Sequence, residues 1–325
     1  MALPINDPKG KLRIGVSGCL LGKMVRFDGQ HAQSNFVRCL AEEHAEFVSF
    51  CPEVEMGMSI PREPIRLVNE NDEVVLRGSR SLQDYTSQMR EFSDAKAKTL
   101  IAMDLDACIV KSKSPSCGME RVKVYLENGH PAKRAAGIFT ATLRALAPDL
   151  PVEEEGRLND PVLRENFFLR VYARRRVKQL FQKAWRRGDV VEFHRREKFL
   201  LLSQNESTYR KLGTLVANIS QFSRANFKDS YMRLYLASFE NRFSVKRHVN
   251  TLYHMYGFLK KDMGASVKSF FHSTLTDFRD QLIPLSVVIA VLHGLIHDLN
   301  NQYLATQSYL QPFPRSLSLR NFITC

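Results

Sequence analysis

Short apolar runs alternate with longer amphipathic segments over the first half of the chain. The runs are rich in β-branched residues and bounded by turn-forming residues, which is typical of buried strands; they are LRIGVS (12–17), EFVSF (46–50), DACIVK (106–111) and VKVY (122–125). Segments with helical periodicity separate them: 35–44, 81–100 and 137–148. This alternation predicts an α/β fold, a Rossmann-like parallel sheet covered by helices.

Helical periodicity dominates the second half. We expect helical segments at 160–187, 189–204, 207–220, 233–261, 266–282 and 285–298. Asp160 and Pro161 form a helix start, because Asp caps a helix and Pro is tolerated in its first turn. We therefore expect two domains: residues 1–158 form the α/β domain and residues 159–325 form an all-helical C-terminal domain.

Charge separates the same two halves. Residues 1–160 contain 21 Lys and Arg against 23 Asp and Glu, whereas residues 161–325 contain 26 against 11. An excess of 15 positive charges in one half indicates a polyanionic partner, either nucleic acid or a membrane surface. The apolar stretch 282–296 is too short to span a membrane, and the MALP start lacks the apolar segment of a signal peptide, so we expect a cytoplasmic protein.

Three of the six cysteines share one local pattern. Cys19, Cys51 and Cys117 each follow an apolar run and precede turn-forming or polar residues. The carboxyl ends of parallel strands meet at one edge of a sheet, and ligands bind there. Cys39 and Cys108 lie inside apolar segments and are expected to be structural, and Cys325 is terminal.

Three thiolates at one sheet edge can hold an iron–sulfur cluster and leave one iron open as a Lewis acid. Structural cysteines and a zinc site remain as alternatives. Glu53 and the serines before Cys117 could position water or transfer protons, although Glu53 is also interpretable as a solvated loop carboxylate. Arg62 and Arg66 could bind a phosphate or a carbonyl group of a ligand, or pair with Glu63 or Glu53 as part of the loop. The acidic run 153–155 is interpreted as a solvated turn that pairs with Arg157.

Four stretches of the chain resemble the motifs of a known family. The stretches VSGCLLGKMVRFDGQH, CPEVEMGMSIPREPIRLV, KSKSPSCGMERVKVY and LPVEEEGRLNDPVLRENFF resemble, in order and spacing, the thiouracil desulfidase family. The helical half resembles the domain that accompanies it in a two-domain class, similar to bacterial desulfidases of 4-thiouridine in tRNA. Phe27 stands where Tyr is familiar in that family, and Glu55 where Gly is common.

This resemblance implies a 4Fe-4S cluster held by Cys19, Cys51 and Cys117, whose open iron binds the substrate sulfur. It also implies that Glu53 and a serine of the SPSC run assist, with Ser114 preferred to Ser116. Glu53 would activate water for attack on C4 of the pyrimidine without net electron transfer, giving uridine and sulfide. The alternatives are a desulfidase of free thiolated bases or nucleosides and a non-catalytic nucleic-acid-binding protein.

Basic residues gather in two stretches of the helical half. The tRNA-binding residues predicted from them are Arg174, Arg175, Arg176, Lys178, Arg186, Arg187, Arg247 and Lys261. Arg247 and Lys261 are expected on one stripe of a single helix with Asn250 and His254. The interleaved aromatics Tyr172, Trp185, Phe193 and Tyr209 are candidates for stacking on unpaired bases. A solvated basic surface is the alternative interpretation.

Overall fold

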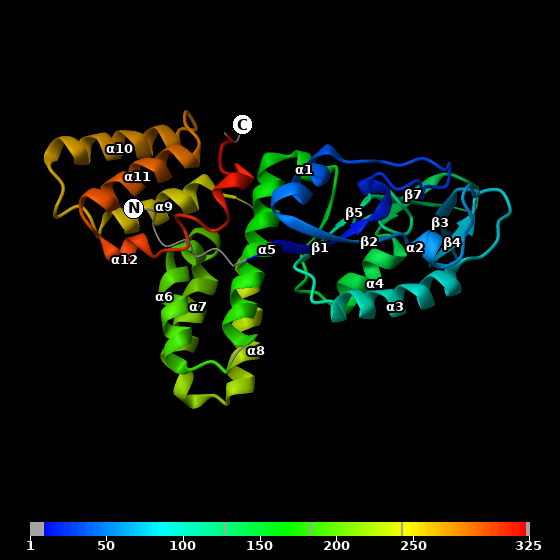
Figure 1. Ribbon diagram of the computed structural model, residues 1–325, viewed down its shortest axis with the longest axis horizontal. Coiled ribbons are helices and arrows are strands. Elements are labelled where there is room, and N and C mark those ends of the chain that lie inside the picture. The colour runs from blue at the N-terminus through cyan, green and yellow to red at the C-terminus, as the bar shows by residue number, and fades with distance from the viewer. Residues whose placement is uncertain (1–9, 127, 183, 242, 323–325) are drawn as a thin grey trace. The chain divides into compact units, whose positions relative to one another are not determined.

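The computed structural model describes residues 10–126, 128–182, 184–241 and 243–322 (Figure 1). The chain forms two compact units, residues 10–160 and a helical unit that begins at Pro161. Among the described residues, no helix is both long enough and apolar enough to cross a membrane.

A four-stranded parallel sheet organises the first unit. Its strands, in spatial order, are β2 (Ala45–Phe50), β1 (Leu12–Ser17), β5 (Ala107–Val110) and β8 (Val152–Glu154). β5 is buried along its whole length, as expected of a central strand covered on both faces. The predicted α/β class, with a parallel sheet in the N-terminal half and helices in the C-terminal half, is therefore confirmed.

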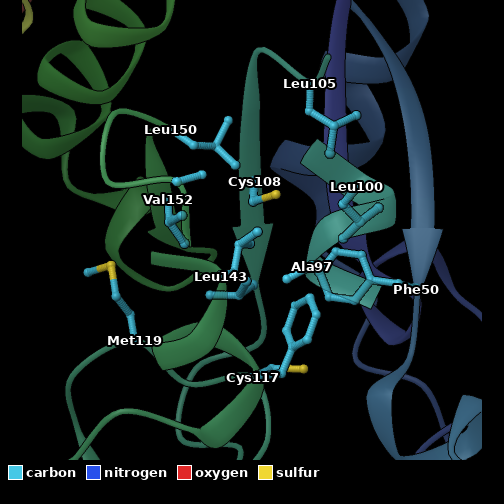
Figure 2. Close-up of a cluster of buried hydrophobic side chains, with 13 residues drawn as sticks. Phe50, Ala97, Leu100, Leu105, Cys108, Cys117, Met119, Leu143, Leu150 and Val152 are labelled. Carbon is cyan, nitrogen blue, oxygen red and sulfur yellow. The ribbon is translucent and has the colours of Figure 1, made fainter. Parts of the chain in front are cut away.

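Two helices cover one face of this sheet. They are α3 (Thr86–Ala102) and α4 (Ile138–Leu146), and α1 (Asn35–Glu43) lies on the opposite side (Figure 1). Side chains from both helices and from β2, β5 and β8 form one apolar cluster, in which Phe50 and Phe139 pack with ring centroids 4.8 Å apart. Figure 2 shows Cys108 in the middle of this cluster and Cys117 at its edge.

A second, mixed sheet is the main feature that the sequence analysis missed. Its strands, in spatial order, are β4 (Glu73–Gly78), β3 (Ile65–Glu70), β6 (Val122–Tyr125) and β7 (Pro131–Ala135). The run 122–125 therefore belongs to this sheet and not to the parallel one. A tight turn joins β3 to β4, and its residues Asn71 and Asp72 both have positive φ. Turns of this kind are favoured in hairpins because their backbone twist matches the twist of the two flanking strands.

The helical unit contains eight α-helices within its described residues. They are α5 (Pro161–Gln182), α6 (Arg187–Gln204), α7 (Glu206–Ala217), α8 (Arg224–Ala237), α9 (Val245–Tyr256), α10 (Ala265–Arg279), α11 (Leu285–Asp298) and α12 (Gln302–Ala305). The expected single segment 233–261 is wrong, because α8 ends at Ala237 and α9 at Tyr256. Gly257 follows α9, and glycine disfavours continued helix.

Candidate functional site

The carboxyl edge of the parallel sheet carries all three of the selected cysteines. Cys19 lies in the single turn η1 (Gly18–Leu21) directly after β1, Cys51 follows β2, and Cys117 lies on the loop after β5. All three line one cavity of about 410 Å³. The sequence argument therefore placed these thiols on the correct edge, and the structure brings them to a common space.

The Cys117 loop is fixed from two directions. The Cys117 backbone N–H donates to Ser114 Oγ at 3.2 Å, and Thr140 Oγ1 of α4 donates to the Cys117 carbonyl at 2.6 Å. Gly137 permits this approach, because a Cβ there would lie 2.5 Å from the Ser116 carbonyl. A larger residue at Gly137 would push the thiol-bearing loop away from the helix.

Glu53 belongs to the cavity wall and is not a solvated loop carboxylate. It lies on the short helix α2 (Pro52–Glu55), and its side chain is 13% exposed. Arg62 holds one carboxylate oxygen at 2.6 Å, and Ser116 Oγ donates to the other at 2.7 Å. Ser114 Oγ lies 2.9 Å from Ser116 Oγ. The two serines and the glutamate thus form a continuous hydrogen-bonded chain, in which Ser116 makes the direct contact.

Burial controls the protonation of the thiols. Burial, with a smaller effect of the neighbouring Cys51, raises the pKa of Cys19 to about 11. Burial likewise raises the pKa of Cys51 and, most strongly, that of Cys117. The thiols alone would be protonated at neutral pH, and a bound metal centre would stabilise the thiolates.

The other two cysteines within the described residues do not line this cavity. Cys108 is buried inside the apolar cluster, and Cys39 on α1 is exposed. Cys325 lies outside the described residues. Within those residues, no three Cys, His, Asp or Glu side chains are arranged to hold a single metal ion. Cys19, Cys51 and Cys117 instead line the walls of a space.

The acidic run at the end of β8 was misjudged from the sequence. Glu153 pairs with Arg157 as expected, but Glu153 and Glu154 are buried. Glu155 accepts hydrogen bonds from the Ser112 backbone N–H and from Ser112 Oγ, and pairs with Lys111. This run therefore supports the loop that leads to Cys117. The signal available in the sequence was its position directly after an apolar run, the same pattern that selected the cysteines.

The burial of Arg176 contradicts its predicted place in a nucleic-acid interface. Its guanidinium is buried and binds both Glu197 carboxylate oxygens, at 2.9 and 3.1 Å, and the Pro312 carbonyl at 2.7 Å. Burial opposes the charged form, but Glu197 overcomes it and raises the pKa of Arg176. Tyr172 and Trp185 are also buried, so neither is free to stack on a base. The predicted role is wrong for these residues.

The other predicted basic residues differ in exposure. Arg186 and Arg187 are exposed at the start of α6, whereas Arg174, Arg175 and Lys178 on α5 are half-buried. Arg247 is half-buried, and its Nε donates to the Ser203 carbonyl at 3.3 Å. Lys261 is exposed but lies beyond the end of α9, so the expected single-helix stripe is wrong.

Fold and site together define an α/β protein with a thiol-lined ligand cavity at the carboxyl edge of its parallel sheet. The 2-thiouracil desulfurase family matches residues 14–155, which include every residue of that cavity. The uncharacterized protein YbbK of Bacillus subtilis is 36% identical over 151 residues, which cover 45% of this chain and 97% of YbbK. The chain therefore belongs to the 2-thiouracil desulfurase family.

Further similarities extend this comparison. The uncharacterized protein YbgA of Escherichia coli is 22% identical over 158 residues, 48% of this chain and 94% of YbgA. A family described as a protein of unknown function (DUF1722) matches residues 198–314, within the helical unit. The solved structure of the 4Fe-4S-dependent thiouracil desulfidase TudS is 30% identical, with a TM-score of 0.38, over 46% of this chain and 95% of TudS.

Proposed function

We propose that this protein removes sulfur from 4-thiouridine in tRNA, giving uridine and sulfide. The observation that carries the proposal is the convergence of three cysteine thiols with the Glu53, Ser116 and Ser114 chain in one cavity of a desulfurase-family unit. The large positive charge of the second half supports a polyanionic substrate and a cytoplasmic RNA partner.

A 4Fe-4S cluster held by Cys19, Cys51 and Cys117 fits this donor set. The three thiols come from three different segments that follow β1, β2 and β5, and they line a common space; thiolates are the usual ligands of iron–sulfur clusters. When bound, a cluster with three protein ligands supplies a Lewis-acid iron for the thiocarbonyl sulfur. The iron of a bound cluster would stabilise the thiolates and so offset the burial cost that raises the pKa values of these thiols.

The chain's own residues supply the proton transfers. Arg62 and Ser116 orient the Glu53 carboxylate toward the cavity, where it accepts a proton from a water that attacks C4. The Ser116 and Ser114 hydroxyls can pass a proton along their 2.9 Å contact. One oxygen from water replaces one sulfur at C4, and sulfur leaves as sulfide. Because both atoms keep their oxidation states, no electron donor is required.

Anaerobic reconstitution with iron and sulfide tests the proposal. Sulfide release and uridine formation should be compared with three substrates: tRNA containing 4-thiouridine, the free nucleoside 4-thiouridine, and 2-thiouracil. We expect the highest kcat/KM with tRNA. Turnover of only the small substrates would contradict the tRNA assignment, and an iron-loaded protein that releases no sulfide from any of them would contradict desulfidase activity. In that second case, retained tRNA binding would favour a non-catalytic binding protein.

A further inference from the structure

The second, mixed sheet of the first unit has two unlike faces. Leu67, Leu76 and Val124 point to one face and belong to an apolar cluster that includes a side chain of α3 (Figure 1). Successive side chains of a strand point to opposite faces of the sheet, so the residues between these point the other way. The basic residues on that second face are Arg66 of β3, Arg77 of β4, Lys123 of β6 and Arg134 of β7.

The strand register places these four residues, here called the basic row, in one line across the sheet. Arg66 lies opposite Arg77, and Lys123 lies opposite Arg134. The parallel register of β3 and β6 places Arg66 beside Lys123. Neighbouring strands lie about 4.8 Å apart, so the row extends for about 14 Å. Like charges directly opposite each other destabilise a sheet, and the row is therefore unfavourable in the absence of a bound anion.

Most of the basic row has no counter-charge within the described residues. Arg77 alone pairs with carboxylates of the same unit. Lys123 and Arg134 are exposed, and neither makes a hydrogen bond or an ion pair with any residue that the structure describes. Arg66 is half-buried, and its Nε is buried with no hydrogen-bond partner. Three neighbouring cations are thus available to an external anion.

Protection of an exposed sheet edge does not explain the row. Lysines on edge strands discourage pairing with another chain, which accounts for Lys133 and Arg134 on the edge strand β7. Arg66 and Lys123, however, lie on β3 and β6, and each of these strands has a hydrogen-bonded neighbour on both sides. Central strands need no such protection, so their cations point to a ligand.

An aromatic ring on the same face favours a nucleic acid. The Arg66 guanidinium lies 5.7 Å from the centroid of the half-buried Tyr125 ring. Open sheets that combine cations with aromatic rings bind single-stranded segments in several RNA-binding modules. A membrane surface fits less well, because none of the four strands, all within the described residues, exposes a large apolar side chain that could enter a lipid layer.

The row also lies close to the desulfurase cavity. Ile65, the residue before Arg66, lines that cavity, and β6 follows the Cys117 loop along the chain. A single phosphate group cannot contact a row about 14 Å long, whereas the backbone of a nucleic acid can. An RNA strand that contacts the row would therefore pass beside the cavity.

We propose that the basic row of the second sheet binds the phosphate backbone of the RNA substrate. This inference rests on the proposed function, since it gives the RNA a contact surface in the unit that contains the cavity. A unit with a small negative charge balance then contributes RNA affinity of its own, because its cations are gathered on one sheet face.

Binding of an unmodified tRNA transcript tests this without turnover. The affinity of the anaerobically reconstituted full-length protein should be measured by fluorescence anisotropy over a range of salt concentrations. Lys123→Gln combined with Arg134→Gln should raise Kd about tenfold and reduce the slope of log Kd against log salt concentration by about two, one for each lost phosphate contact. Lys123→Arg combined with Arg134→Lys keeps both charges and should retain the parental affinity.

Stability provides a second measurement on the same variant. Lys123→Gln combined with Arg134→Gln removes a pair of like charges, so the free energy of unfolding in urea should equal or exceed that of the parent protein. A merely structural role for the pair would instead lower stability together with RNA binding. Iron content and turnover of free 4-thiouridine show whether the cavity is intact.

Arg38→Gln combined with Arg144→Gln is the matched control. It removes the same charge from exposed positions on α1 and α4 of the same unit, and should change the affinity far less. Parental tRNA affinity in the Lys123 and Arg134 double variant overturns the inference. Equal losses in the two double variants also overturn it, because net charge alone would then account for the effect.

Vesicles of phosphatidylcholine and phosphatidylserine form a separate arm of the experiment. Vesicle binding that depends on Lys123 and Arg134, with tRNA affinity unchanged, would assign the face to anionic lipid and overturn the inference. The two proposals can fail separately. A protein whose tRNA affinity depends on the row but that releases no sulfide would retain the surface and lose the desulfidase function. A protein that desulfurates tRNA with no such dependence would retain the function and lose the surface.

Discussion

The two units of the chain use their arginines in opposite ways. In the first unit, Arg62 pairs with Glu53 in the wall of the cavity, where Ser116 shares the same carboxylate. In the helical unit, Arg176 pairs with Glu197 inside the core, where Tyr235 Oη donates to Glu197 at 2.6 Å. One ion pair lies in the wall of a cavity, and the other is closed on every side by protein.

Net charge therefore overstates the basic surface that a polyanion could reach. The helical half has the larger excess of basic residues, but Arg176 and Arg320 are buried, the second against Glu165 at 3.0 Å. The first half has a small negative balance, yet the residues that line its cavity include four basic side chains and one acidic side chain. The positions of the charged residues therefore indicate more about the ligand than the net charge does.

The largest expected effect separates the cysteines of the cavity from the others. Replacing Cys19, Cys51 or Cys117 by Ala should abolish sulfide release and lower iron content, because a cluster with only two protein thiolates is poorly held. Cys39→Ser and Cys108→Ala are the matched controls and should retain iron and activity. Iron and acid-labile sulfide should be quantified beside turnover. Equal iron in Cys117→Ala and parent protein would remove Cys117 from the ligand set.

Glu53→Gln should give the next largest effect. The amide keeps the shape of the side chain but cannot accept the proton of water, so kcat should fall by about 10²- to 10⁴-fold with iron content unchanged. Ser116→Ala should lower kcat more than Ser114→Ala, because Ser116 makes the 2.7 Å contact with Glu53. Single-turnover sulfide release measures this order directly. A larger loss for Ser114→Ala would restore Ser114 to the leading role that the sequence comparison implied.

The contrast between buried and exposed arginines predicts that replacing the buried one lowers stability, whereas replacing exposed ones weakens tRNA binding. Arg176→Met leaves Glu197 buried without its partner and should lower the free energy of unfolding by about 3–5 kcal/mol. Arg186→Gln combined with Arg187→Gln should change stability by about 0.5 kcal/mol or less. The double variant should instead weaken tRNA binding and flatten its salt dependence by about one unit of slope per lost phosphate contact. Urea denaturation and salt-dependent binding test the two halves of this prediction. Parental tRNA affinity in the double variant would show that this end of α6 faces no RNA.

The sequence predicted the parallel sheet and the edge where the thiols meet because both follow from local rules. An apolar run buries itself as a strand, and whatever follows a parallel strand lies at its carboxyl edge. The burial of Arg176 has a local signal as well, since Leu169, Tyr172 and Arg176 share a helical face. A count of basic residues does not distinguish buried arginines from exposed ones, so it missed this signal. The hydrogen bonds that Ser112 donates to Glu155 join residues 43 positions apart and follow from tertiary packing, which no local pattern encodes.

The last expected effect appears only below about pH 6.5 and comes from two histidines of the helical unit. Burial lowers the pKa of His194 from 6.5 to about 4, and its Nδ1 lies 3.2 Å from Tyr231 Oη. Burial, together with the charges of Arg320 and Arg247, also lowers the pKa of His248 well below its usual value. Both rings therefore stay neutral in the folded unit at a pH where the unfolded chain has begun to take up protons.

Because the unfolded chain binds more protons, the stability of this unit should fall as the pH decreases from about 6.5 toward 4. Each histidine should contribute up to about 1.4 kcal/mol per pH unit in that window. Urea denaturation between pH 7 and 5 measures the slope. His194→Gln should reduce the slope of the unfolding free energy against pH by the contribution of one histidine. His297→Gln alters a side chain that is 70% exposed and should leave this slope unchanged. A parental slope in His194→Gln would mean that other groups govern the acid sensitivity of the helical core.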